Sequence, residues 1–141
     1  MEKYTDMTDE EYALPSSYLK IKNSRVLYDI YLKILDKMVV GEKYLQPDYS
    51  ARMLADELGT NSRYISAAIR LYGHQNFPQM INEYRIRAAT KFILDGQSVR
   101  CSMADIAMRV GFANRQSFYN AFQRIHKMSP RAFQQTDTNK K

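Results

Sequence analysis

The sequence feature that most constrains the fold is a short pattern that occurs twice. Ala55 and Gly59, four residues apart, recur as Ala107 and Gly111. In both copies a short apolar segment with a polar start precedes the pair, and a segment with polar residues on one helical face follows it. This is typical of a helix-turn-helix unit, in which a small residue lets two helices cross closely and glycine takes the tight turn. Two such units in one short basic chain favour a protein that reads DNA.

The charge distribution agrees with this interpretation. The 141 residues carry a net charge of +6, but residues 1–20 hold five acidic residues against two lysines, so residues 21–141 carry +9. A basic body attracts polyanions, of which nucleic acid is the commonest. A charge of this size also serves solubility alone, so it supports DNA binding without deciding it.

Residue types that build metal or disulfide sites are scarce. Cys101 is the single cysteine, which excludes an intramolecular disulfide and a multi-thiolate zinc site, and only His74 and His126 could add imidazole ligands. We expect no metal, no cofactor and no catalytic residue. No apolar run of about 18 residues and no secretory leader is present, which predicts a cytoplasmic protein without a membrane partner.

The chain divides by composition into three parts. Residues 1–23 are predicted to be an acidic, weakly structured lead-in or linker, and 136–141 a disordered tail. Between them we expect an all-α domain over 24–135, because period-two alternation is absent. It comprises a first helix-turn-helix subdomain (24–77), a linking helix (78–95) and a second helix-turn-helix subdomain (96–135).

The first predicted helix starts at Ser24 as N-cap and stops before Gly41. Its apolar stripe has helical spacing and consists of Val26, Leu27, Ile30, Tyr31, Ile34, Leu35 and Met38. We expect this stripe to pack on the first helix-turn-helix unit, because heptads are not sustained over the length that a coiled coil needs. A dimer seam is the alternative.

The other helices outside the two repeats are set by proline and glycine. Pro78 in a first turn and Gly96 after Asp95 bound the long linking helix. Ser129 and Pro130 start a short C-terminal helix, whose Phe133 is expected to pack back on the second unit.

Helical geometry indicates which side chains of the first recognition helix reach DNA bases. Its inner face is predicted to hold Ile65, Ala68, Ile69 and Tyr72, which leaves an outer face of Arg63, Ser66, Ala67 and Arg70. Arg63 could bind guanine O6 and N7, and Ala67 could contact a thymine methyl group. Polar residues opposite an apolar stripe are also what any surface helix shows.

The second recognition helix has the same division. Its predicted inner face holds Phe118, Ala121, Phe122 and Ile125, and its outer face Gln116, Asn120 and Gln123, flanked by Arg115 and Tyr119. Amide side chains suit adenine N6 and N7, so Gln116 and Asn120, with Arg115, are the predicted base contacts here.

Phosphate contacts are expected from a further set of residues, since more than half of protein–DNA hydrogen bonds go to the backbone. The predicted set is Ser62, Arg85, Asn114, Tyr119, Arg124 and Arg131. The arginines among them could equally be solubilising charges.

The second half of the chain resembles a known family. The spaced residues are Asp105, Ile106, Ala107, Val110, Gly111, Phe112, Asn114, Phe118, Phe122, Met128, Ser129, Pro130 and Phe133. They resemble the signature of AraC/XylS-type transcription regulators, and the resemblance extends over about 24–134. It implies a bihelical DNA-binding domain of about seven helices, whose two recognition helices enter successive major-groove segments of double-stranded DNA. Position matching also favours Arg63, Ser66, Ala67, Arg115, Gln116 and Asn120 as base contacts.

The sequence departs from the family pattern in three places. Gln134 stands where a basic residue is common, and in the first unit Gly73, before His74, is shifted by one position from the place of the usual glycine. Lys127 stands where the family usually has glycine. A non-glycine residue in left-handed backbone costs about 1 kcal/mol, which the fold should tolerate.

The resemblance also implies a mode of action and leaves alternatives open. It implies a regulator that acts on RNA polymerase at nearby promoters, as a monomer on DNA or a weak dimer. The chain could instead be the output domain detached from a larger sensor protein, or a protein-interaction module with the same fold. Some relatives transfer alkyl groups through reactive cysteines, but Cys101 without further cysteines makes an enzyme unfavoured.

Overall fold

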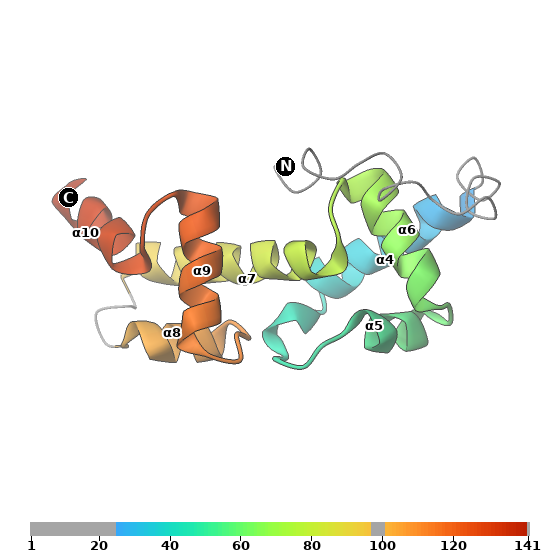
Figure 1. Ribbon diagram of the computed structural model, residues 1–141, viewed down its shortest axis with the longest axis horizontal. Coiled ribbons are helices and arrows are strands. Elements are labelled where there is room, and N and C mark those ends of the chain that lie inside the picture. The colour runs from blue at the N-terminus through green and yellow to red at the C-terminus, as the bar shows by residue number, and fades with distance from the viewer. Residues whose placement is uncertain (1–24, 97–100, 141) are drawn as a thin grey trace. The chain divides into compact units, whose positions relative to one another are not determined.

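The computed structural model describes residues 25–96 and 101–140. Within these ranges the chain forms seven α-helices and one 3-10 helix, with no strand (Figure 1). They are α4 (Arg25–Val39), η1 (Lys43–Leu45), α5 (Ala51–Leu58), α6 (Ser62–Gly73), α7 (Phe77–Leu94), α8 (Met103–Arg109), α9 (Arg115–His126) and α10 (Pro130–Lys140). The predicted all-α class with about seven helices is therefore confirmed.

The described residues form two compact units. The first unit consists of residues 25–42 and 49–80, and the second unit of residues 43–48 and 81–140 outside the gap. The short segment around η1 thus belongs with the second unit, although the sequence favoured a boundary near residue 77. The buried side chain of Arg85 on α7 holds the η1 segment in the second unit through hydrogen bonds that are described below.

The core of the first unit confirms the packing expected for the first helix. Helix α4 packs against α6 and α5, and its buried stripe is Leu27, Ile30, Ile34 and Met38. Val26 lies outside the stripe and is exposed. The predicted N-cap Ser24 and the predicted lead-in lie outside the described residues.

A small polar network supports the first unit. The hydroxyl of Tyr49 donates a hydrogen bond to Oε1 of Glu57 at 2.7 Å, and Nζ of Lys37 lies 3.9 Å from the same oxygen. Burial and the Glu57 carboxylate raise the pKa of Tyr49 well above its ordinary value. The phenol therefore stays protonated and keeps its hydrogen bond, which links the start of α5 to its last turn.

The second unit has a core of aromatic and aliphatic side chains from three helices. They are Ile86, Ala89 and Ile93 of α7, Met103, Ile106 and Ala107 of α8, and Phe118, Ala121 and Phe122 of α9. Helix α10 adds Phe133, whose ring centroid lies 5.6 Å from that of Phe122. The predicted packing of Phe133 is therefore confirmed.

The C-terminal residues differ from the disordered tail predicted for 136–141. Helix α10 continues to Lys140, and Oγ1 of Thr136 donates to the carbonyl of Ala132 at 2.9 Å. No glycine or proline follows Pro130 in the sequence, so nothing local stops the helix once Ser129 has capped it through the amide of Ala132. Residue 141 lies outside the described part.

Helices α6 and α9 both end on a non-glycine residue in left-handed backbone. The C-cap of α6 is His74 with φ 56°, and that of α9 is Lys127 with φ 62°. The amide of Lys127 still donates to the carbonyl of Gln123 at 2.8 Å, so the turn is formed despite the side chain. This is the geometry in which glycine is favoured.

We expect Lys127→Gly to raise the free energy of unfolding by about 0.5–1 kcal/mol, because it relieves left-handed strain without removing the backbone hydrogen bond. Chemical denaturation measures the change. Gln123→Gly, in ordinary helical backbone of the same helix, is the control and should lower stability by about 1 kcal/mol. Equal destabilisation by both substitutions would show that the turn is not strained.

Candidate nucleic-acid interface

Each repeat begins with a serine that caps its first helix. Oγ of Ser50 accepts a hydrogen bond from the amide of Met53 at 3.1 Å, and Oγ of Ser102 accepts one from the amide of Asp105, also at 3.1 Å. Capping fixes where α5 and α8 start. Because both caps lie five residues before the repeated alanine, the two repeats are set in the same register.

The repeated alanine and glycine have the roles expected from the sequence. Ala55 is 2% exposed and lies where α5 packs on α6, and Ala107 is 0% exposed and lies where α8 packs on α9. Gly59 and Gly111 have φ of 69° and 104°, which side chains rarely adopt. The amide after each glycine donates to the carbonyl of the repeated alanine: Thr60 to Ala55 at 2.9 Å and Phe112 to Ala107 at 3.0 Å.

Helix α6 presents a polar surface in its first turns. Oδ1 of Asn61 caps the helix by accepting from the amide of Tyr64 at 3.0 Å. Ser62 and Arg63 are exposed, and Ser66 and Arg70 are half-buried. These four residues occupy one side of α6, so four of the residues predicted to contact DNA in this unit do share a face.

The prediction for Ala67 is wrong. Ala67 is 1% exposed and belongs to the core, so its methyl group cannot reach a base in this structure. Helix α6 packs against α4 as well as α5, and two contact sides bury a wider arc than the single stripe assumed from the sequence.

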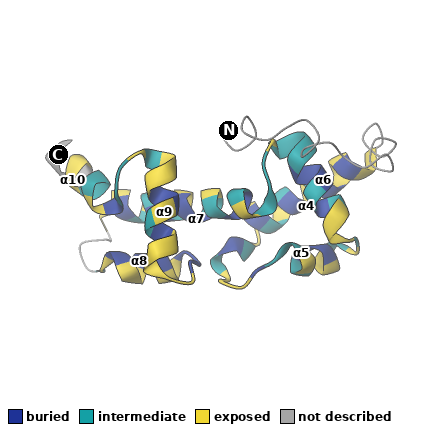
Figure 2. Ribbon diagram, in the orientation of Figure 1, coloured by how far each residue is buried: buried dark blue, intermediate teal, exposed yellow. Residues whose placement is uncertain are grey.

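Helix α9 has a polar face opposite its buried aromatic residues (Figure 2). Oδ1 of Asn114 caps the helix by accepting from the amide of Ser117 at 2.8 Å. Gln116 and Asn120 are exposed, and Nε2 of Gln116 donates to Oδ1 of Asn120 at 2.9 Å. This pairing holds two amide side chains together while the Gln116 oxygen and the Asn120 nitrogen are left to meet other groups.

The first turn of α9 also carries a positioned cation. The guanidinium of Arg115 lies 4.8 Å from the ring centroid of Tyr119, and Nη2 of Arg115 is 3.3 Å from the Tyr119 hydroxyl. An arginine that rests on an aromatic ring loses little further freedom on binding. Of the other predicted phosphate contacts in this unit, Arg124 and Arg131 are exposed.

Ile125 does not join the inner face that was predicted for α9. It is 37% exposed, whereas Phe118, Ala121 and Phe122 are buried. The core contact of α9 is centred on these three residues, and Ile125 lies at its border, where it faces a pocket beside α7.

Arg85 is not a phosphate contact in this structure, contrary to the prediction. It is 8% exposed, its Nε donates to the carbonyl of Tyr44 at 2.7 Å, and its Nη2 donates to the carbonyl of Gln46 at 3.0 Å. Its guanidinium also lies 5.6 Å from the ring centroid of Phe112. Burial lowers the pKa of Arg85, although arginine keeps its charge at physiological pH. Arg85 therefore ties the η1 segment to the second unit.

Sequence reasoning missed two exposed residues at the starts of α6 and α9. Asn61 caps α6 as Asn114 caps α9, and Ser117 lies exposed in the first turn of α9. The signal for Asn61 was present, because an asparagine three residues before an apolar helical pattern is a typical N-cap.

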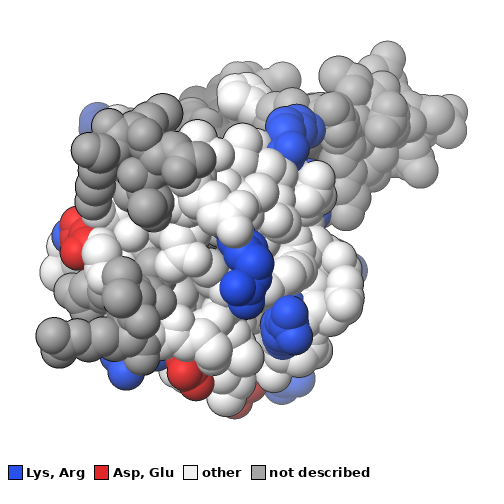
Figure 3. Space-filling view, turned by 90° about the vertical axis from the view of Figure 1, so that its left-hand side faces the viewer, with Lys and Arg blue, Asp and Glu red and all other residues white. Residues whose placement is uncertain are grey.

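The surface charge is spread rather than dense. At the end of the second unit that Figure 3 shows, Lys and Arg side chains stand apart on a largely uncharged surface. Among the residues that the structure describes, His, Cys, Asp and Glu form no group that could hold a metal ion. None of the described helices combines the length and apolar character needed to cross a membrane.

The sequence profile of the helix-turn-helix domain family matches residues 54–136, which is more than half of the chain. The chain belongs to the AraC-type helix-turn-helix family. Members of this family are DNA-binding domains rather than enzymes. The matched range contains both repeated alanine–glycine pairs and the helices α6 and α9, so it includes all the base-contact candidates.

Two solved structures have the same AraC-type fold. The C-terminal domain of AraT, a response regulator from Geobacillus stearothermophilus, is 22% identical with a TM-score of 0.64, over 80% of this chain and 86% of that one. The C-terminal domain of the two-component response regulator yesN from Fusobacterium nucleatum subsp. nucleatum ATCC 25586 is 20% identical with a TM-score of 0.63, over 73% and 97%. No curated protein sequence matches the chain. At these identities the structures establish the fold.

Proposed function

We propose that the chain is a sequence-specific transcription regulator that reads two adjacent major-groove segments, one with α6 and one with α9. It would act on RNA polymerase at nearby promoters, as a monomer on DNA or a weak dimer. The observation that carries the proposal is that the complete helix-turn-helix unit occurs twice. Each copy has the capped first helix, the buried alanine, the left-handed glycine and an asparagine-capped second helix with an exposed polar first turn.

Base reading is assigned to the exposed side chains of these two helices. In α6, Arg63 suits guanine, whose O6 and N7 can accept both arms of a guanidinium, with Ser66 and Arg70 beside it. In α9, the paired amides of Gln116 and Asn120 suit adenine, and Arg115 lies one position before them. Since Ala67 is buried, it has no part in this assignment.

Phosphate contacts are assigned to residues near the helix starts and to exposed cations. Ser62 and Asn114 lie where free backbone amides and the helix dipole favour a phosphate. Tyr119, Arg124 and Arg131 are the further candidates on the second unit. These contacts would fix the register of the protein on the duplex without reading its sequence.

A second form of the proposal is that the chain is the DNA-binding output domain of a larger sensor protein. The observation that favours it is that both similar structures are C-terminal domains of response regulators. A protein-interaction module is less favoured, because the exposed faces of α6 and α9 are basic and amide-rich rather than acidic or apolar.

The proposal predicts that Arg63→Ala and Gln116→Ala each cost roughly 1–3 kcal/mol of binding at the preferred site and relax the preference at one or two base pairs. Fluorescence anisotropy with the preferred duplex and a random duplex measures both effects. Lys33→Ala, which removes an exposed cation of α4, and Cys101→Ser are the controls and should leave the preference unchanged. If Arg63→Ala weakens binding to both duplexes equally, α6 does not read bases.

A further inference from the structure

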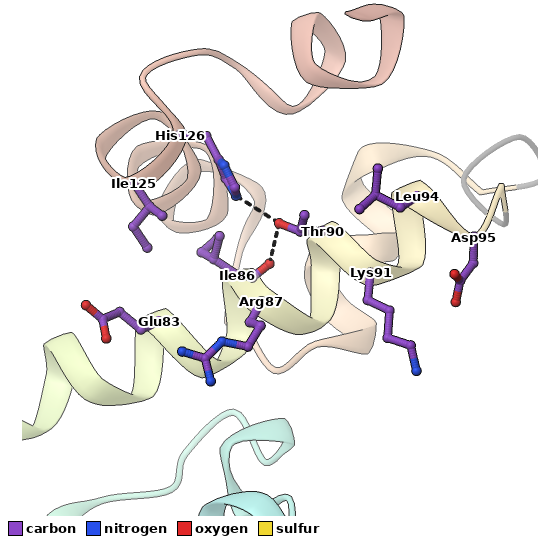
Figure 4. A pocket seen from close by; sticks show the side chains of 9 residues that line it. All are labelled: Glu83, Ile86, Arg87, Thr90, Lys91, Leu94, Asp95, Ile125 and His126. Carbon is purple, nitrogen blue, oxygen red and sulfur yellow. Dashed lines mark hydrogen bonds between the residues drawn. The ribbon is translucent and has the colours of Figure 1, made fainter. Parts of the chain in front are cut away.

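The second unit contains a pocket that DNA reading does not use. It has a volume of about 560 Å³ and lies between α7 and the last turn of α9 (Figure 4). Its apolar walls are Ile86 and Leu94 from α7 and Ile125 from α9. Leu94 and Ile125 are 44% and 37% exposed. Two large apolar side chains at the border of the pocket are therefore in contact with solvent. A pocket of this size and character suits a small organic molecule.

The polar groups in the floor of the pocket already have their hydrogen bonds. Oγ1 of Thr90 donates its one hydrogen to the carbonyl of Ile86 at 2.8 Å. The contact of 2.9 Å between Thr90 Oγ1 and His126 Nε2 is therefore a hydrogen bond that the imidazole donates. The ring of His126 is held against Phe122 and Phe133, at centroid distances of 4.5 and 5.0 Å.

This arrangement fixes the state of His126 and the character of the floor. Burial lowers the pKa of His126, so its imidazole is neutral at pH 7, with the hydrogen on Nε2. Thr90 already has hydrogen-bond partners and the imidazole of His126 is neutral, so neither group would attract the charged group of a ligand. A charged group of a ligand would have to be bound at the rim instead.

One rim of the pocket is a line of four charged residues, three on α7 and the fourth, Asp95, in the turn that directly follows it. Glu83, Arg87, Lys91 and Asp95 follow each other at four-residue spacing, which places them along one side of the helix. The two cations are in the middle and the two acids at the ends. Of the ion pairs within 4 Å among the described residues, none involves this line.

The two cations of the rim differ in freedom. Both are exposed, but the guanidinium of Arg87 rests 5.1 Å from the ring centroid of Tyr84, whereas Lys91 has a long flexible stem. In Figure 4 both side chains start on the α7 border of the pocket and extend away from His126 and Ile125, so a cation must change its side-chain rotamer to face the hollow. The flexible stem of Lys91 allows it to turn its ammonium group over the hollow, next to a second positive charge.

We propose that this pocket binds a small amphipathic anion. The apolar body of the ligand would lie against Ile86, Leu94 and Ile125, and its anionic group would be bound by Lys91 with Arg87 beside it. The acids at both ends of the rim would repel the anionic group and so centre it on the cations. The site is separate from the exposed faces of α6 and α9 to which base reading is assigned, so either proposal can fail alone.

Two fluorescent probes that differ in one charged group test the proposal. 8-Anilinonaphthalene-1-sulfonate has an apolar aromatic body and a sulfonate, and N-phenyl-1-naphthylamine is the same body without the sulfonate. The sulfonated probe is expected to bind the full chain saturably, at least about fivefold more tightly than the neutral probe, and to shift the methyl resonances of Ile125.

Variants at exposed positions locate the site. The double variant Arg87→Gln, Lys91→Gln should weaken binding of the sulfonated probe by roughly five- to tenfold and leave the neutral probe unchanged. Ile125→Glu should weaken the sulfonated probe by at least about tenfold, because it places a carboxylate in the apolar wall. Lys33→Gln, on α4 of the first unit, is the matched control and should change neither.

The proposal would be overturned by any of three results. They are equal binding of the two probes by the wild-type chain, unchanged binding of the sulfonated probe by the double variant, and the absence of saturable binding. Denaturation midpoints of all variants, with their DNA affinities, are measured in parallel. A variant that keeps its midpoint and its DNA affinity but loses the probe separates the pocket from both folding and DNA reading.

Discussion

Replacing Gly111 with alanine is expected to destabilise the second unit by at least about 3 kcal/mol, a large share of the roughly 5–15 kcal/mol that keeps a typical domain folded. Gly111 has φ 104°, and a Cβ atom there would overlap the carbonyl oxygen of Tyr44 and lie 2.9 Å from Nε of Arg85. Neither neighbour can move freely, because Arg85 Nε donates to that same carbonyl at 2.7 Å. The substitution would therefore separate the η1 segment from α7 and break a buried hydrogen bond.

The other repeat supplies a matched control. Gly59 occupies the same place in the first unit with φ 69°, but nothing lies within 4 Å of an added Cβ atom. Gly59→Ala should cost only the backbone strain, about 1 kcal/mol. Hydrogen exchange of the two units, compared for both variants, measures the costs separately. Equal costs would mean that the turn at Gly111 is not clamped by Tyr44 and Arg85.

DNA binding is expected to weaken by about 10³ to 10⁵ between 50 and 200 mM salt, if roughly six to ten phosphates are neutralised. Residues 21–141 carry +9, which is enough charge for contacts of that number. Anisotropy titrations with a random duplex over this range give the slope directly. Arg124→Gln, at an exposed position of α9, should make the slope shallower by about one. An affinity that does not change with salt would favour the protein-interaction module.

Much of the fold follows from local sequence chemistry. The repeated alanine and glycine, the serine caps and the proline at the start of α7 each act through a few neighbouring residues, so the pattern predicts them directly. The all-α class was predicted for this reason, whereas the number of helices was implied by the family resemblance. The left-handed C-cap at Lys127 was expected on other grounds, because the family resemblance places a glycine at this position.

The errors occurred where a residue's environment depends on other helices. Ala67 is buried because α6 packs on α4 and α5 together, and a stripe on one helix cannot show how many neighbours cover it. Arg85 looked like one of several arginines on the polar side of α7, and only the fold brings the carbonyls of Tyr44 and Gln46 to it. Ile125 has the spacing of an inner residue but lies at the edge of the core.

The candidate site was predictable in part for the same reasons. Arg63, Gln116 and Asn120 are exposed as expected, because early positions of a capped helix opposite its apolar stripe are seldom covered. The pairing of Gln116 with Asn120 joins residues four apart on one helix, which the spacing allowed but did not require. Their roles as base contacts remain predictions.

The most direct test of two-helix reading is a selection of bound sequences from random duplex DNA, performed in parallel with the wild-type chain, Arg63→Ala and Gln116→Ala. We expect the wild-type chain to enrich one site made of two short blocks. Arg63→Ala should lose sequence preference in one block only, and Gln116→Ala in the other only. A wild-type selection with a single block, or a loss in the same block for both variants, would contradict the proposal that α6 and α9 read separate major-groove segments.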